Sequence, residues 1–206
     1  MMRAATRSLK SDPVSRAGAW ALAGLLLVSA CRPAADRSPA ATALPRDSLV
    51  VMASGSDLES GHPLVTVHPL TRQLHRHALF VTLVRLDSLL QPLPYFARTW
   101  EWSADRTALT LTLDSTLRWH DGVPTTAGDV VFTLRAVQDS TVGSPRRADL
   151  AALQAADTLG TNRVRLTFAS PQPRLPIVLA ELPLAPRHLL DSVPRARWRQ
   201  RHFATS

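Results

Sequence analysis

The clearest pattern in the chain is the alternation of apolar and polar positions between residues 97 and 113. Residues 97–102 alternate around two tryptophans, and residues 109–113 alternate leucine with threonine. Alternation of this kind has the period of a strand with one buried face. A turn at residues 104–106 separates the two runs, so we expect a β-hairpin. The side of this hairpin that faces the core would carry Leu109, Leu111 and Leu113.

Residues 119–134 show a second pattern, which predicts a tight turn followed by an amphipathic helix. An Asp-Gly pair favours the turn, because glycine tolerates positive φ and aspartate bonds its own backbone. One of two threonines, Thr125 or Thr126, can cap the helix, and an aspartate in its first turn suits the helix dipole. Apolar residues then recur at helical spacing to a predicted end near residue 139. The predicted structural motif comprises Trp119, Asp121, Gly122, Thr126 and Asp129.

Periodicity and turn residues also predict the strands and helices of the remaining part of residues 48–206. They predict strands at residues 48–53 and 164–168, an extended link at 90–94, and helices at 71–84, 148–153 and 175–182. Leu74, Ala78 and Val81 share the face of the first helix that we expect to be buried. The hairpin needs large apolar side chains packed against it. We therefore expect Trp100, Trp102 and Trp119 in the core.

The first 47 residues are typical of an export signal and a tether. A basic start precedes an apolar run at residues 17–28, which is shorter than the roughly 20 residues of a membrane span. The run ends in Leu27-Val28-Ser29-Ala30-Cys31, the pattern of a lipobox. We therefore expect a lipoprotein signal peptide at residues 1–30, lipidation of Cys31, and a flexible Pro/Ala/Ser-rich tether at residues 31–47. An ordinary signal peptide or a buried cysteine is the alternative.

Composition excludes some classes of protein. The 206 residues carry a formal net charge of +8, almost all of it from arginine, since Lys10 is the one lysine. This surplus is modest and is not interleaved with aromatic residues, which argues against nucleic-acid binding. The histidines, among them His75 and His77, lack the spacing of a closed metal site. No nucleophile–base set is visible, so we expect no enzyme activity, no catalytic residues, no cofactor and no protein-ligated metal.

Residues 96–130 resemble a known family. Phe96-Ala-Arg-Thr-Trp100 and Trp119-His-Asp-Gly-Val-Pro-Thr-Thr-Ala-Gly-Asp-Val130 are similar to successive motifs of the extracellular solute-binding proteins of family 5. These are peptide- and nickel-binding lipoproteins that serve ABC importers. The likeness extends over about residues 48–206, through Gly143-Ser144-Pro145 and Pro186-Arg187-His188. It departs from the family pattern at Asp114, where an arginine is usual.

The resemblance implies a fold and a function. The fold is α/β, the N-terminal lobe of a periplasmic-binding-protein-like structure (type II, cluster C) with a small β-rich subdomain, ending before the second lobe. The function is binding of a peptide or similar solute for an ABC permease, by an exported protein anchored through Cys31 on the periplasmic side or the cell surface. A short envelope lipoprotein that uses this lobe as an interaction or structural module is the alternative. Candidate ligand contacts are Thr66, His68 and Arg146.

Overall fold

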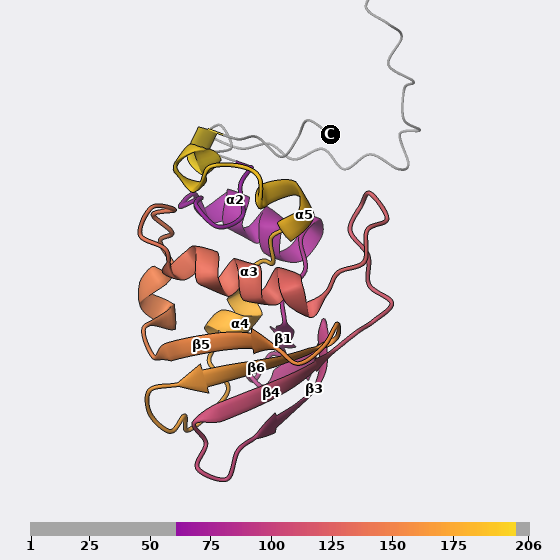
Figure 1. Cartoon of the computed structure of the whole chain (residues 1–206), viewed down its shortest axis with the longest axis vertical. Helices are drawn as coiled ribbons and strands as arrows, with labels where there is room; N and C mark the ends of the chain where they lie inside the picture. The colour runs from indigo at the N-terminus through magenta and orange to yellow at the C-terminus, as the bar shows by residue number, and fades with distance from the viewer. Residues whose placement is uncertain (1–60, 201–206) are drawn as a thin grey trace, which may run out of the picture. The chain divides into compact units, whose positions relative to one another are not determined.

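A four-stranded antiparallel sheet is the centre of residues 61–200, the part of the chain that this computed structural model describes (Figure 1). The strands run in the order β3-β4-β6-β5. Their bounds are Ala97–Trp102 for β3, Ala108–Leu113 for β4, Leu153–Thr158 for β5 and Arg163–Phe168 for β6. The predicted hairpin and the strand near residues 164–168 are confirmed, whereas β5 was not foreseen. The three leucines expected to face the core, at 109, 111 and 113, are 0%, 0% and 3% exposed.

Helix α3, Ala127–Gln138, covers one face of this sheet and contacts β5 and β6. Val130, Leu134 and Val137 are fully buried, as their helical spacing predicts. The helix ends at its C-cap Asp139, where it was expected to end. Figure 1 shows α3 lying between the sheet and the short helix α5, Arg187–Leu190, so both sides of α3 are covered.

The helix predicted at residues 71–84 is shorter than expected. It consists of α2, Pro69–Leu74, and a π-helical turn η3, His75–Leu79. Phe80 is extended, with φ at −129°, and the chain continues into strand β1, Val84–Leu86, which pairs with β2, Pro92–Pro94. β-Branched residues dominate positions 81–84 and favour extended backbone. The Thr82 hydroxyl also donates to the Val84 carbonyl at 2.8 Å, which holds this segment extended.

The buried face of that helical segment was also predicted wrongly. Thr71 and His75 are 3% and 1% exposed, whereas Leu74 is half-buried and Ala78 is exposed. Val81 is buried, but it lies beyond the end of the helix. The π-helical turn changes the angular spacing of the residues that follow, so a face assigned with a constant period of 3.6 does not hold.

Short helical turns complete the described chain. They are η4 at Arg147–Leu150, α4 at Val178–Glu181 and η5 at Arg195–Gln200. The predicted helix at 148–153 is shorter because Leu153 belongs to β5, and that at 175–182 is shorter because prolines flank α4. Trp100, Trp102 and Trp119 are half-buried at the edge of the core, and Trp198 is fully buried.

Several predictions concern residues that the structure does not describe. The signal peptide, Cys31, the tether and the strand at residues 48–53 all lie outside the described residues. Within residues 61–200, no helix has the length and apolar character required to cross a bilayer.

Candidate functional site

The turn at residues 119–123 forms as its sequence predicts. The Trp119 amide donates to the Val123 carbonyl at 2.8 Å, and the Gly122 amide donates to the Trp119 carbonyl at 2.9 Å. Gly122 has φ at +84°, a conformation that glycine adopts without strain. Asp121 Oδ1 accepts the Val123 amide at 3.1 Å, so the aspartate stabilises the turn through its own backbone neighbours.

Asp129 links the start of α3 to α5. Thr126 is the N-cap residue, and both its amide and its hydroxyl donate to Asp129 Oδ2, at 2.8 and 3.0 Å. The other oxygen, Oδ1, accepts the amide of Arg187 at 2.9 Å. Asp129 is only 4% exposed, so a buried carboxylate satisfies donors of two elements at once. Thr126 and Asp129 thus join the start of α3 to the start of α5.

A histidine completes the contact between the turn and α5. His188 Nε2 lies 2.7 Å from Asp121 Oδ2, and the His188 ring lies 6.3 Å from that of Trp119. The contact with His188, helped by the Val123 amide, lowers the pKa of Asp121. Among the described residues no hydroxyl is hydrogen-bonded to His188, so the pair has no adjacent nucleophile. The arrangement positions two elements and does not form a catalytic set.

Two adjoining cavities lie along the contact between α3 and α5. The first, of about 390 Å³, is lined by Gly128, Val131, Phe132, Arg135, Asp157, Thr158, Arg187, Asp191 and Arg195. The second, of about 610 Å³, is lined by Val123, Pro124, Thr126, Asp129, Arg187, His188, Asp191 and Ser192. Arg187 and Asp191 line both cavities, so we treat them together as the α3–α5 face.

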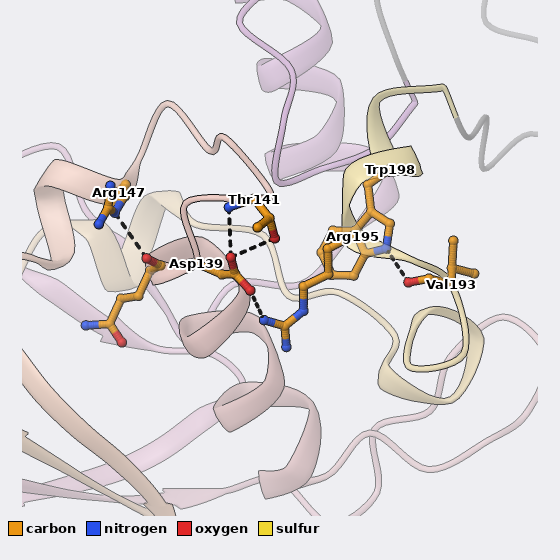
Figure 2. A network of polar contacts seen from close by, with 7 residues as sticks. Asp139, Thr141, Arg147, Val193, Arg195 and Trp198 are labelled. Carbon is orange, nitrogen blue, oxygen red and sulfur yellow. Dashed lines mark hydrogen bonds and ion pairs between the residues drawn. The ribbon is translucent and has the colours of Figure 1, made fainter.

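Three arginines give the α3–α5 face its charge. Arg135 lies 3.3 Å from Asp157, and Arg187 lies 3.4 Å from Asp191, with all four side chains more than half exposed. Exposed pairs of this kind are weak, so these guanidinium groups can exchange an aspartate for an anionic group of a ligand. The third arginine, Arg195, is paired with Asp139 (Figure 2).

Asp139 also orders the loop after α3. Figure 2 shows that it accepts the amide and hydroxyl of Thr141 as well as the Arg195 guanidinium. The hydroxyl of Thr141, then its amide and Arg195, lower the pKa of Asp139 to about 2. Arg195, which lines the first cavity, is therefore held by an ionised carboxylate at the end of α3.

The candidate ligand contacts drawn from sequence do not line either cavity. Thr66 is 2% exposed. His68 caps α2, and its Nδ1 accepts the Thr71 amide at 3.4 Å. Arg146 lies 2.8 Å from Asp149 and 2.5 Å from Glu181, and its side chain is 19% exposed. None of the three lines the α3–α5 face, and their ligand role stays a prediction.

The arginines and aspartate of the α3–α5 face were not singled out from the sequence. Arg187, Asp191 and Arg195 recur every four residues, but α5 ends at Leu190 and η5 begins only at Arg195, so helical spacing does not predict this charged face. As for metals, residues 61–200 contain no group of three His, Cys, Asp or Glu side chains that could hold an ion.

Residues 61–200 have an α/β architecture, a four-stranded sheet with helix α3 packed on one face. Residues 91–205 match the family described as Bacterial extracellular solute-binding proteins, family 5 Middle. The chain therefore belongs to family 5 of the bacterial extracellular solute-binding proteins, a family that binds solutes and does not catalyse reactions.

Proteins similar to this chain are also named as binding proteins. The "Probable peptide ABC transporter periplasmic-binding protein y4tO" of Sinorhizobium fredii is 38% identical over 96 residues, which are 47% of this chain and 18% of that protein. The oligopeptide-binding protein AppA of Bacillus subtilis, solved with a nonapeptide, superposes with a TM-score of 0.63 and 20% identity over 68% of this chain and 28% of its own.

A second solved structure shows the same fold. NikZ of Campylobacter jejuni, solved in complex with Ni(L-His), gives a TM-score of 0.58 and 23% identity over 66% of this chain and 27% of its own. These likenesses confirm that the described residues adopt part of the cluster C binding-protein fold. The chain thus matches less than a third of the length of each of these three proteins.

Proposed function

We propose that this chain is a lipid-anchored substrate-binding protein of an ABC-type importer, and that it takes peptides or similar solutes. The family match over residues 91–205 is the observation that carries the proposal. The printed name of the Sinorhizobium relative and the nonapeptide in the Bacillus structure support peptides as the solute class. The partners would be the permease subunits of the importer, and the lipid on Cys31 would hold the protein at the periplasmic side of a membrane or at the cell surface.

The α3–α5 face is the part of the described chain best suited to contact such a solute. Peptides carry a terminal carboxylate, and a guanidinium group binds a carboxylate through two parallel hydrogen bonds. Arg187 lines both cavities and its present partner, Asp191, is a solvent-exposed side chain of the same helical turn. Thr66, His68 and Arg146 remain further candidate contacts.

Isothermal titration calorimetry with a library of short peptides tests this function. Arg187→Ala should weaken peptide binding roughly tenfold, the usual effect of losing one hydrogen bond to a charged group. Arg163→Ala is the matched control, because Arg163 is an exposed arginine on β6 away from both cavities. Equal affinity of the two variants would place the solute elsewhere, and absence of peptide binding in a protein that carries both lobes would argue against peptides.

The alternative is an envelope lipoprotein in which this lobe is an interaction or structural module. Gene order separates the two functions. A reading frame for the second lobe directly downstream, beside permease and ATPase genes, supports the importer. A stable folded product with no such neighbours supports the module.

A further inference from the structure

The turn that joins β1 to β2, residues 87–91, presents two leucines to solvent. Leu89 is 76% exposed and Leu90 is 67% exposed, and Leu93 just beyond the turn is 45% exposed. Single exposed leucines are common on protein surfaces, but three within five residues make this end of the hairpin unusually apolar. We call Leu89, Leu90 and Leu93 the leucine tip.

Hydrogen bonds within residues 87–91 hold the leucine tip in place. Asp87 Oδ1 accepts the amides of Leu89 and Gln91, both at 2.8 Å. The Asp87 amide donates to the Gln91 carbonyl at 3.0 Å, and the Leu90 amide donates to the Asp87 carbonyl at 3.1 Å. The turn is therefore ordered by its own contacts, so the leucines project from a defined scaffold.

The backbone of Leu90 is strained. Its φ is +60°, in the left-handed region that glycine adopts freely and that branched or bulky side chains avoid. A turn of this geometry would be more stable with glycine at position 90. The chain instead carries a large apolar side chain there and exposes it, and strain combined with exposure is typical of positions with a binding role.

A cation and an aromatic ring lie at the base of the leucine tip. Arg85 is directly opposite Leu93 in the pairing of β1 with β2, and its guanidinium carbon lies 3.8 Å from the centre of the Tyr95 ring. At a bilayer surface, apolar side chains lie among the acyl chains, and Tyr and Arg side chains lie at the level of the headgroups. The leucines at the tip, with a tyrosine and an arginine at its base, follow the same order. Asp87 is half-buried in its turn, and the charge of Arg85 offsets its own.

The size of the leucine tip favours a membrane over a protein partner. A specific protein interface buries about 800 Å² on each side, usually over 20 or more residues. A tip of three leucines is far smaller, but apolar side chains of this number can enter a lipid surface. We propose that the β1–β2 turn inserts Leu89 and Leu90 into the surface of a phospholipid bilayer. A lipid on Cys31 would keep the turn near that bilayer, but insertion itself does not require it.

Site-specific fluorescence on the full chain tests the insertion. In a Cys31→Ser background, Ser88→Cys places a single thiol on the exposed tip, and Ser170→Cys places one in an exposed loop after β6. Each variant is labelled with an environment-sensitive fluorophore and mixed with vesicles containing anionic phospholipid. The label at position 88 should shift its emission to shorter wavelength and be quenched by lipids with quenchers in their acyl chains, while the label at position 170 should do neither.

The double variant Leu89→Ser/Leu90→Ser should reduce insertion of the labelled tip about tenfold or more, since burial of one leucyl side chain is itself worth about a factor of ten. Ile177→Ser, at another exposed apolar residue that is 54% exposed, should leave insertion unchanged. A label at position 88 that remains in water, or a double variant that inserts as well as the parent, would overturn the proposal. Because Cys31 is absent from every variant, neither result depends on lipid attachment, which is tested separately below.

Discussion

Asp129 shows how one side chain can set the position of two elements. Its carboxylate caps α3 through Thr126 and accepts the backbone amide of Arg187. Thr133, one turn further along, donates to the Asp129 carbonyl at 2.7 Å and accepts the Ala185 amide at 2.9 Å. Both residues are almost fully buried, so each satisfies donors that would otherwise lose their hydrogen bonds to water.

Replacing Asp129 should therefore be costly. Asp129→Ala removes the helix cap and leaves the Arg187 amide without its acceptor, which together should lower the free energy of unfolding by about 2–4 kcal/mol. Urea denaturation followed by circular dichroism measures this loss. Asp191→Ala is the control, because its exposed pair with Arg187 should contribute less than about 1 kcal/mol. Similar losses in both variants would show that Asp129 does not link α3 to α5.

Leu90, the residue with left-handed backbone in the β1–β2 turn, gives a prediction in which a substitution raises the free energy of unfolding. Leu90→Gly should raise the free energy of unfolding by about 1 kcal/mol, because glycine adopts φ of +60° without a steric penalty. Leu89→Gly is a matched substitution one residue away, outside the left-handed region, and should give no gain. Thermal denaturation of the two variants measures the difference, and a loss of stability in Leu90→Gly would mean that the leucine contributes more through contacts than its backbone costs.

At the scale of elements, the first and last described segments are joined by an aromatic stack. The His62 ring lies 4.7 Å from that of Trp198 in η5, at an interplanar angle of 24°, and both residues are fully buried. Trp198 also packs against Phe132 of α3, with 5.8 Å between ring centres. Figure 2 shows that the Trp198 indole donates to the Val193 carbonyl, so η5 is held by contacts with two rings and by the indole N–H.

This stack should make stability depend on pH. Burial, and to a lesser extent the nearby His75, lower the pKa of His62 from 6.5 to about 4. The unfolded chain therefore binds more protons than the folded chain between pH 6.5 and 4, so stability falls as pH falls through this range. The loss should reach up to about 3 kcal/mol near pH 4. The depressed carboxyl pKa values of Asp105, Asp114 and Asp139, each about 2, act only at lower pH.

Denaturant titrations at pH 7, 5.5 and 4.5 measure this dependence. His62→Phe keeps an aromatic ring against Trp198 and removes the titrating group, so its stability should fall less steeply with acid. Burial also lowers the pKa of His75, and the remaining slope should reflect that second histidine. Parallel pH profiles for the parent and His62→Phe would contradict the assignment.

At the scale of the whole molecule, the lipobox predicts that a lipid is attached to Cys31. Cys31→Ser removes the thiol that the predicted lipid would modify. In a bacterial expression host, the parent should partition into detergent and show a mass increase from acyl chains, whereas Cys31→Ser should do neither. The cysteine is the only one in the chain, so thiol labelling checks the result independently. A free thiol on Cys31 in the mature parent would contradict lipid attachment.

Sequence reasoning was most successful where one local rule decided the structure. The leucine alternation of β4 and the cap at Thr126 were predictable, because strand period and helix capping depend on neighbouring residues. The α3–α5 face was not predictable in this way, because its contacts join residues that are far apart in the chain. Asp129 and Arg187, for example, are 58 positions apart. Leu90 falls in the extended link predicted at residues 90–94. A leucine gives no sign of left-handed backbone, which the hydrogen bonds to Asp87 impose here.

The contacts of α3 with residues 185–188 also set an order of events during synthesis. The hydrogen bond from the Ala185 amide to Thr133 spans 52 residues, and the contact between His188 and Asp121 spans 67. Until residue 188 has left the ribosome, α3 can pack on the sheet but its other side has no cover. That side of α3 therefore stays exposed through most of the synthesis of the described residues.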